Sequence, residues 1–467
     1  MLPDDALERL QDGCRIIGNK CKSIGIKQWE VVATQSYGHQ IDIEGGKISL
    51  AGGGGEGGYG IRVIEDGKFG FAYLVDAKSA DAAINSAISI ARISPSIDGF
   101  VLPSDQETVK VSGLYDKNII EMDSEQLLSQ ADAIISHVSS LEKKAVVTGG
   151  GVGVSATASS ILTSEGIESG GLVTSHGVGV QVSIDHNEQL TSSWQSKSSR
   201  TKMEQVPDCI GSAVEWAKLT RDPIKVESND IDSPVILTSE GFSPLFSVVV
   251  PTAIKGDKLV RNESFWSGKM NENVISKDLT LIDDATVDGA KSSGSRDDEG
   301  VPSRKNILID SGKLVASLWS TRDAAQQIYE GRISDAETTG SAIRSGHQSP
   351  PISGCSNLYL SSSKPSNNFE SLLELMDDGY VINGVMGAHT ANPTSGDFSV
   401  TTSSILRVEN GQIIGSVKQA GVSGNIAKSL QSDVFLGDEI KSQGSYSSGT
   451  MYLPNVLLKQ GIRVNTV

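Results

Sequence analysis

Histidine, cysteine, serine and acidic residues supply most catalytic and metal-binding groups, but few of them stand here at spacings typical of a known site. The six histidines include no pair at the HExxH or HxH spacing that would bring two imidazoles to one metal ion. The sequence has no GxSxG motif, which argues against a serine hydrolase of the nucleophile-elbow type. The cysteines are too few and too scattered for a disulfide framework or a CxxC metal site. We interpret all four as core thiols: Cys14, Cys21, Cys209 and Cys355.

One acidic cluster could hold a hard cation through its carboxylate oxygens. It comprises Asp297, Asp298 and Glu299, with Asp283 and Asp284 upstream. Consecutive residues of a strand point to opposite faces, however, so neighbouring acids rarely share one ion. We therefore expect a solvated loop that orders the neighbouring backbone. A hydrolase that uses a non-zinc metal at this cluster is kept as an alternative.

A glycine-rich run over residues 52–58 formally matches GxGxxG at Gly53, Gly55 and Gly58. A dinucleotide-binding fingerprint must open a helix whose N-terminus faces the pyrophosphate, whereas this run lies between predicted strands. We interpret it as a flexible connection between two hairpins that overhangs a cleft. The run 149–153 lacks the Gly-Lys-Ser/Thr ending of a phosphate-binding loop, so we interpret it as packing glycine within a strand.

The elements that must position these residues mix helices and hairpins in the first half of the chain. Apolar residues spaced three and four apart predict helices near residues 7–21, 80–91, 124–141 and 209–217, the third capped by Asp123. Alternating apolar residues on both sides of Gly45-Gly46 and of Asp66-Gly67 predict two hairpins. The Ser/Thr/Gly-rich segment between residues 145 and 198 predicts a meander of strands.

The second half is richer in predicted strands. Residues 221–234 carry two prolines and a cluster of Asp and Asn, and we place the domain boundary there. A strand over 235–237 precedes the apolar segment 242–254, which we interpret as a buried helix interrupted or ended near Pro251. Hairpin turns at 310–312 and 409–411 and helices near 323–329 and 369–376 follow.

These elements predict an α+β fold in two parts, because runs of strands and separate helices replace strict βαβ alternation. We expect an N-terminal domain over residues 1–230 with a mixed antiparallel sheet, helices and the meander. We expect a β-rich C-terminal domain over residues 231–467 that is barrel-like or sandwich-like.

The charge balance excludes some partners. Against 57 Asp and Glu stand 40 Lys and Arg, a formal net charge of −17, which argues against binding to a nucleic-acid backbone. No run of 18 or more apolar residues occurs, and the N-terminal residues lack the basic-then-apolar order of a signal peptide. We expect a cytoplasmic protein that binds neither nucleic acid nor membrane.

Seven short segments, taken in order, resemble the TldD/PmbA family, in which PmbA is also called TldE. No single segment is very specific, but their order and spacing cover nearly the whole chain. They are GGYGIRV at 57–63, GKFGFA at 67–72, GLYD at 113–116, DDEGVP at 297–302, SGDFS at 395–399, VENGQI at 408–413 and SGNI at 423–426.

The resemblance implies a heterodimeric cytosolic metallopeptidase that acts on unfolded proteins or peptides. In the TldD subunit, a helix bearing HExxxH binds zinc with help from a cysteine near the C-terminus, and its glutamate acts as general base. In this chain Ser247 and Thr252 stand at the histidine positions, Val248 at the glutamate position and Ser448 near the cysteine position. Hydroxyl groups are poor zinc ligands, and valine cannot relay a proton. We therefore expect a PmbA-type (TldE-like) subunit with no zinc of its own and a zinc-bearing, HExxxH-containing TldD-like partner.

Other interpretations remain open at this point. Besides the non-metal-binding subunit and the hydrolase with a non-zinc site, the chain could be a homodimeric peptide-binding module without a catalytic partner. Gly396 and Asp397 are candidates for the wall of a substrate chamber. The alternative for these two residues is a turn that leads into the strand over residues 398–404.

Overall fold

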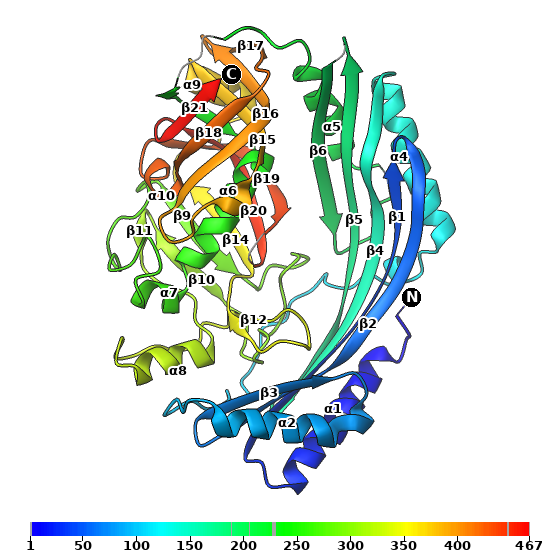
Figure 1. Cartoon of the computed structure of the whole chain (residues 1–467), viewed down its shortest axis with the longest axis vertical. Coiled ribbons are helices and arrows are strands. Elements are labelled where there is room, and N and C mark those ends of the chain that lie inside the picture. Colours follow the sequence, from blue (N-terminus) through cyan, green and yellow to red (C-terminus); the bar gives the residue numbers. More distant parts are fainter. Residues whose placement is uncertain (1, 188, 205, 227–229, 446–447, 467) are drawn as a thin grey trace.

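The structure is a computed structural model that describes residues 2–187, 189–204, 206–226, 230–445 and 448–466. It confirms the α+β fold class: an antiparallel sheet with helices is followed by a β-rich part built around a larger sheet. In Figure 1 the long strands of the first sheet run along one side of the molecule, and the second sheet faces them from the other side.

The first sheet is fully antiparallel, with the strand order β3-β2-β1-β4-β5-β6. Its long strands come from alternating or glycine-rich sequence, and the two predicted hairpins are confirmed where β1 turns into β2 and β2 into β3. The bounds are β1 (Gln28–Glu44), β2 (Lys47–Glu65), β3 (Lys68–Leu74), β4 (Ala145–Thr163), β5 (Glu168–His186) and β6 (Gln189–Ser199).

Helices cover one face of this sheet. On β1, Val31 and Ala33 pack against α1 and α2, while Ile41 and Ile43 pack in the cluster formed with α4 and α5. All four are odd-numbered residues of one continuous strand, so both groups of helices lie on the same face. The even-numbered residues, including Glu30, point toward the second half. The helices are α1 (Ala6–Ser23), η1 (Ala77–Ser79), α2 (Ala80–Ile93), α3 (Lys117–Ile120), α4 (Ser124–Leu141) and α5 (Cys209–Leu219).

The glycine-rich run 52–58 is strand, and the prediction of a flexible connection was wrong. These residues lie inside β2 and pair in register with β1, for example Gly58 with Thr34 and Gly54 with Gly38. Glycine tolerates extended backbone, and the ladder of hydrogen bonds to β1 fixes a conformation that no side-chain pattern announces. The run 149–153 also lies in a strand, β4, as predicted.

The second sheet has thirteen strands among the described residues. Its main path is β11-β10-β9-β14-β20-β8-β15-β16-β18-β21-β7, with β17 beside β16 and β19 beside β20. Most pairs are antiparallel, but β14 runs parallel to β20 and β8 runs parallel to β15. The bounds are β7 (Asp230–Asp232), β8 (Val235–Leu237), β9 (Leu279–Asp284), β10 (Lys305–Asp310), β11 (Lys313–Leu314), β14 (Asn357–Ser362), β15 (Gly379–Met386), β16 (Asp397–Glu409), β17 (Gln412–Ser416), β18 (Ala420–Asn425), β19 (Val434–Gly444), β20 (Thr450–Leu458) and β21 (Ile462–Thr466).

The helix α6 (Ser239–Ala253) packs in the core of the second half. It begins after Thr238, whose side chain accepts a hydrogen bond from the N–H of Gly241, and it contains both Pro244 and Pro251. The helix ends at Ala253, just after Pro251, which confirms the prediction of a buried helix that ends near this proline. A proline removes one helical N–H bond, and here the burial of Leu245, Phe246, Val249 and Val250 offsets that loss.

Shorter elements complete the second half. The helices α7 and α8 follow α6 along the chain, and the small hairpin β12–β13 lies beyond the main sheet. The bounds are α7 (Gly256–Val260), α8 (Thr321–Tyr329), β12 (Ala342–Ile343), β13 (Ile352–Ser353), α9 (Phe369–Met376), η2 (Ala388–Thr390) and α10 (Ile426–Ser429).

Several local predictions are confirmed. Asp123 caps α4, where its side chain accepts from the N–H of Gln126 and the Gln126 side chain accepts from the N–H of Asp123. Three of the four cysteines are buried and Cys209 is partly exposed.

The predicted domain boundary includes residues 227–229, which lie outside the described residues. Among the described residues, no helix is long and apolar enough to cross a membrane.

Candidate functional site

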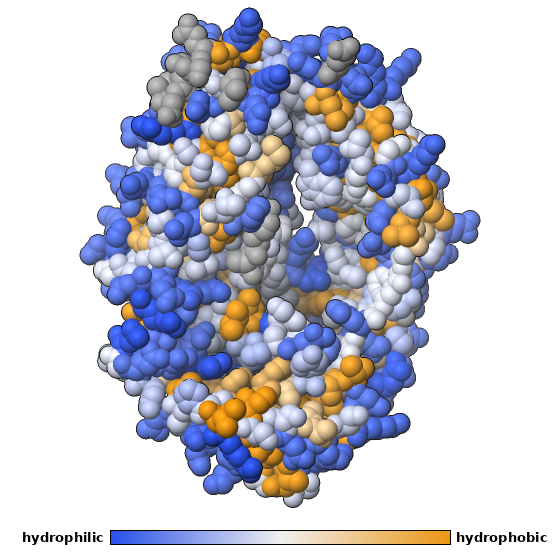
Figure 2. Space-filling view, in the orientation of Figure 1, coloured by the Kyte–Doolittle hydropathy of each residue, from blue (hydrophilic) through white to orange (hydrophobic). Residues whose placement is uncertain are grey.

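Two adjoining cavities lie between the halves of the molecule, and Figure 2 shows the surface hollowed there. The sheet-side cavity has a volume of about 390 Å³ and is lined by residues of β1, β4 and β5 together with loops of the second half. The loop-side cavity has a volume of about 840 Å³ and is lined mainly by loops of the second half, with Val173 and Arg200 from the first. The two share a wall formed by Val173, Ser293, Gly294, Arg296, Asp297, Asp298 and Arg344.

A buried chain of alternating charges joins the two halves beside these cavities. Glu30 and Arg62 are direct partners across β1 and β2, and Nη2 of Arg62 donates to Oε2 of Glu30. From the second half, Oε1 of Glu299 accepts from Nη1 of Arg62 at 2.9 Å, and Nη2 of Arg344 donates to Oε1 of Glu30 at 2.6 Å. We call Arg344, Glu30, Arg62 and Glu299 the charge chain.

The charge chain is almost fully dry. The side chains of Arg62, Glu30 and Glu299 are 0%, 1% and 0% exposed. Burial alone would raise the pKa of Glu30, but Arg344 and Arg62 together hold that pKa below its usual value. The second carboxylate oxygen of Glu299 accepts a hydrogen bond of 2.7 Å from the N–H of Thr321. Thr321 is the first residue of α8. The positive end of that helix therefore also stabilises the carboxylate.

The acidic loop orders the neighbouring backbone as predicted. Oδ1 of Asp297 accepts from the N–H groups of Glu299 and Val301, both at 2.9 Å, and Oδ2 accepts from the N–H of Ala342 at 3.0 Å. Burial and the neighbouring Glu299 raise the pKa of Asp297 to about 8. The prediction that this loop is solvated was wrong in part, because the Glu299 side chain is completely buried in the charge chain. The carboxylates are used in these structural bonds, which weakens the case for a hydrolase at this cluster.

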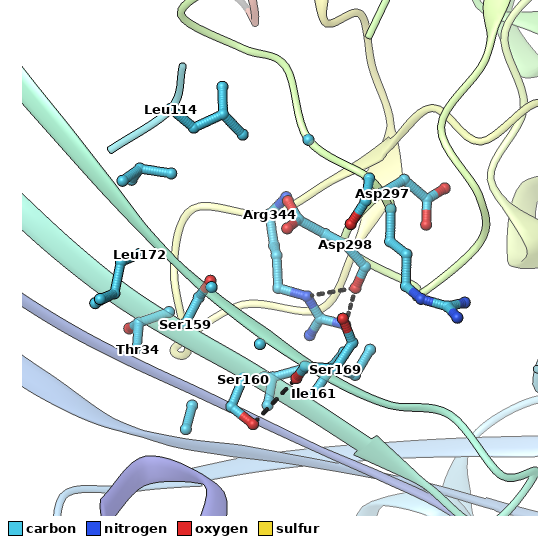
Figure 3. Close-up of a pocket in the computed structure, with 18 of the residues that line it drawn as sticks. Thr34, Leu114, Ser159, Ser160, Ile161, Ser169, Leu172, Asp297, Asp298 and Arg344 are labelled. Atoms are coloured by element: carbon cyan, nitrogen blue, oxygen red, sulfur yellow. Dashed lines mark hydrogen bonds between the residues drawn. The ribbon is translucent and has the colours of Figure 1, made fainter. Parts of the chain in front are cut away.

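Figure 3 shows the sheet-side cavity with Arg344 and Asp298 bonded on one side and the polar side chains of β1, β4 and β5 on the other. Nε and Nη2 of Arg344 donate to the carbonyl oxygen of Asp298 at 3.0 and 2.7 Å. Oγ1 of Thr34 lies 2.9 Å from Nδ1 of His347, and burial lowers the pKa of that imidazole. A methyl group on Gly60 would come within 2.4 Å of the His347 carbonyl oxygen, so this glycine permits the close approach of the loop.

The structure places the three degenerate metal-site positions on α6. Ser247 is completely buried and its hydroxyl donates to the carbonyl oxygen of Pro244 at 3.2 Å. Val248 is partly buried against the core of the second half. Thr252 lies one turn further on and is partly exposed.

Ser448 lies beside Cys355, and both residues line the loop-side cavity. Its Oγ is 3.3 Å from Sγ of Cys355, and it accepts from the Cys355 N–H at 3.3 Å. The N–H of Lys255, just after α6, donates to the carbonyl oxygen of Thr252 at 3.3 Å, and burial lowers the pKa of the Lys255 ammonium. Burial raises the pKa of Cys355 to about 12, so the sulfur is a neutral thiol near pH 7.

These residues do not fit a zinc ion. Zinc in proteins is bound by imidazole, thiolate or carboxylate groups, whereas α6 offers a buried hydroxyl, an aliphatic side chain and a second hydroxyl. Among the described residues, no group of three or more His, Cys, Asp and Glu side chains is arranged to hold a metal ion.

Gly396 lies in the turn before β16, and Asp397 is the first residue of that strand. Gly396 has a φ of +80°, and Asp397 accepts from Oγ of Ser395 at 2.6 Å and from Nδ2 of Asn425 at 2.7 Å. The hydrogen bonds from Ser395 and Asn425 hold the pKa of the exposed Asp397 carboxyl below its usual value. Neither residue lines the two central cavities. Their contact with a substrate stays a prediction.

Sequence reasoning missed the charge chain as a unit. Arg62 stands in an apolar stretch of β2, and a charged residue at such a position could have signalled a buried partner. Nothing local to the sequence identifies that partner, since Glu299 follows it by 237 positions.

Comparison with known protein families identifies the class of protein to which this chain belongs. A family model described as "PmbA/TldA metallopeptidase C-terminal domain" matches residues 231–461, and one described as "PmbA/TldA metallopeptidase domain 1" matches residues 29–91. The chain belongs to the PmbA/TldA metallopeptidase family, as the sequence segments predicted.

Within that family the chain has a TldE-like fold. The crystal structure of TldE from Thermococcus kodakarensis superposes with a TM-score of 0.83, covering 98% of this chain and 99% of that one at 22% identity. Metalloprotease PmbA of Escherichia coli O157:H7 is 23% identical over 91% of both chains. An uncharacterised protein of Methanocaldococcus jannaschii is 28% identical over 92% of this chain and 95% of its own length.

Proposed function

We propose that this chain is the TldE-like subunit of a cytoplasmic two-subunit metallopeptidase, in which it holds an unfolded peptide without binding zinc itself. A partner subunit of the same family, bearing HExxxH, supplies the metal and the general base. This chain alone breaks no peptide bond.

The observation that carries the proposal is the set of side chains on α6. Ser247, Val248 and Thr252 stand where the resemblance places two zinc ligands and a base, and Ser247 already donates to Pro244 within its own helix. A water molecule becomes a nucleophile near neutral pH only when a metal or a base activates it. The helix provides neither group, so the chemistry has to come from another chain.

The cavities between the halves support the peptide-holding part of the proposal. Their volumes of about 390 and 840 Å³ are on the scale of sites that enclose several residues of a peptide. The strand β6 is an edge of the first sheet, and Arg200, which follows it, lines the loop-side cavity. An extended peptide that bonds to main chain is held with little dependence on its sequence.

Coexpression with an HExxxH-bearing family member from the same organism tests the proposal. We expect a stable hetero-oligomer that cleaves an unfolded peptide, is inhibited by chelators and loses activity when the partner's glutamate is replaced by glutamine. Metal analysis should find zinc with the partner and none with this chain. The variants Ser247→Ala and Thr252→Ala should leave the activity of the complex within about twofold of wild type, because neither hydroxyl has a chemical role.

Two outcomes would favour the alternatives. If the isolated chain cleaves peptides and Ser247→Ala abolishes cleavage, the chain is itself catalytic. If it forms homodimers that bind peptide and never associates with the HExxxH-bearing member, it is a peptide-binding module without a catalytic partner.

A further inference from the structure

Two positively charged residues, Arg200 and Lys291, line the loop-side cavity. Arg200 follows β6 in the first half, and Lys291 lies in the loop between β9 and β10 in the second. Nη2 of Arg200 donates to the carbonyl oxygen of Lys291, and Nη1 donates to the carbonyl oxygen of Thr174 at 3.0 Å. We call Arg200 and Lys291 the cation pair.

The cation pair has no counter-charge in the part of the chain that the structure describes. Three other arginines near the cavities each bond a carboxylate: Arg62 bonds Glu30 and Glu299, Arg344 bonds Glu30, and Arg296 bonds Asp105. No salt bridge joins Arg200 or Lys291 to an acid among those residues. This is unusual in a chain with 57 acidic residues and a net charge of −17.

The donors of Arg200 are also incompletely used. A guanidinium has five N–H donors, and the two carbonyls account for two of them. Nε is buried and has no hydrogen-bond partner. Burying such a donor without an acceptor is unfavourable, and buried polar groups in folded proteins are nearly always paired.

Burial and mutual repulsion act on the pair together. Burial lowers the pKa of Arg200 and that of Lys291, and the charge of Arg200 lowers the pKa of Lys291 further. Asp297 and Asp298 line the same cavity but perturb the pKa of neither cation. An anion bound between Arg200 and Lys291 would relieve the repulsion between the two positive charges.

We propose that Arg200 and Lys291 bind a carboxylate group of the peptide that occupies the loop-side cavity. The inference rests on the proposed function, since it assigns part of the peptide to this cavity. The carboxylate is either the C-terminus of the peptide or the side chain of an Asp or Glu. The remaining N–H donors on the two Nη atoms of Arg200 suit a planar carboxylate, and the ammonium of Lys291 adds a second charge-assisted bond.

A binding experiment with the isolated chain separates the two sources of the carboxylate. The probes are one unstructured Ala/Ser peptide, labelled at its N-terminus, with a free C-terminus, with an amidated C-terminus, or amidated with one internal Glu. We expect a charged probe to bind about tenfold or more tightly than the fully neutral amidated probe. Preference for the free C-terminus identifies terminal recognition, and preference for the Glu probe identifies side-chain recognition.

Lys291→Gln is the cleanest variant, because the structure gives its ammonium no bond within the described chain. It should remove most of the preference for the charged probe and leave binding of the neutral probe unchanged. Arg200→Gln should act in the same direction. The matched controls Lys305→Gln and Arg304→Gln remove the same charges from exposed positions in the second half and should keep the preference. Equal binding of charged and neutral probes by wild type would overturn the proposal.

A small probe keeps this inference distinct from the proposed function. If no peptide binds in any form, the proposed peptide-holding function fails. The cation pair is then tested by the effect of N-acetylglycine on the melting temperature. This carboxylate should raise the melting temperature of wild type but not that of Lys291→Gln. The neutral control N-acetylglycinamide should raise neither melting temperature. Stabilisation by inorganic phosphate alone, with no effect of N-acetylglycine, would overturn the assignment to a carboxylate.

Discussion

Arg62 on β2 and Glu299 in the loop before β10 form an ion pair of 2.9 Å whose two side chains are completely buried. The pair joins the first sheet to the second half of the chain, and Glu30 and Arg344 extend it on the other side. A charge buried away from water is unfavourable unless an opposite charge lies beside it. Loss of either residue would therefore leave its partner as a buried charge with less compensation. The relative position of the halves, and with it the shape of both cavities, depends on these bonds.

The charge chain makes a prediction for stability. Glu299→Ala should lower the free energy of unfolding by about 3–5 kcal/mol, because it leaves a buried guanidinium with one carboxylate instead of two. Urea denaturation followed by fluorescence measures the loss. Glu168→Ala is the matched control, since it breaks a half-exposed pair with Arg15 and should cost at most about 1 kcal/mol. Equal losses for the two variants would contradict the structural role given to Glu299.

Asp283 makes a prediction for pH dependence. Burial raises the pKa of this carboxyl to about 7 despite the two hydrogen bonds from Ser356, and its Oδ2 has no hydrogen-bond partner. A carboxyl whose pKa is raised on folding holds its proton more tightly in the native state. Its contribution to stability therefore falls as the pH rises from about 4 to about 7 and is constant above that range.

Asp283→Asn removes this titration. The stability of the variant relative to wild type should increase by about 2–3 kcal/mol between pH 5 and pH 8. Urea unfolding of both proteins at several pH values measures this difference. Asp98→Asn, at an exposed position, should run parallel to wild type over the same range. A constant difference between Asp283→Asn and wild type would mean that the native carboxyl titrates normally.

Gly70 makes a prediction for packing. A methyl group at this position of β3 would lie 1.9 Å from the carbonyl oxygen of Ala87 and 2.7 Å from the N–H nitrogen of Ala91, both on α2. Gly70→Ala should therefore displace the helix and lower the free energy of unfolding by at least about 1–3 kcal/mol. Gly54→Ala in β2, where nothing lies within 4 Å of the new methyl, is the control and should fold normally. Similar urea midpoints for the two variants would show that α2 adapts freely.

Metal removal gives the fourth prediction. A ligand that binds the native state adds to its stability, so a chain with structural or catalytic zinc loses melting temperature when the metal is chelated. We expect the melting temperature of this chain alone to be unchanged by EDTA or 1,10-phenanthroline, measured by differential scanning fluorimetry. Elemental analysis should find well under one zinc per chain. A stoichiometric zinc that survives dialysis would require ligands other than those on α6.

Local structure was predictable where the signal lies in neighbouring residues. Asp66 and Gly67 adopt positive φ angles at the turn between β2 and β3, and the side chain of Asp123 caps α4 where the apolar periodicity begins. The glycine run in β2 was missed because glycine carries no side-chain pattern, so its pairing with β1 decides its conformation. The end of α6 close to Pro251 was predictable, because a proline disfavours a helix that continues far beyond it.

The candidate site was predictable only in part. The resemblance located Ser247, Val248, Thr252 and Ser448. The structure places the first three on one helix and Ser448 beside Cys355 in the wall of the loop-side cavity. Contacts between distant segments could not be predicted, because no periodicity links Thr174, Arg200 and Lys291. The cation pair exists only once the two sheets face each other.

The charge chain also sets an order of events during protein synthesis. Glu30 and Arg62 leave the ribosome long before Glu299 and Arg344, which follow their partners by 237 and 314 positions. At translation speeds of roughly 5–20 residues per second, Glu30 and Arg62 wait roughly 10–60 s for these partners. Contacts between such distant positions form slowly, since the intervening chain must close a large loop. During that interval Glu30 and Arg62 are exposed on an unfinished surface, and nascent chains stalled before residue 299 should bind chaperones that the finished protein does not.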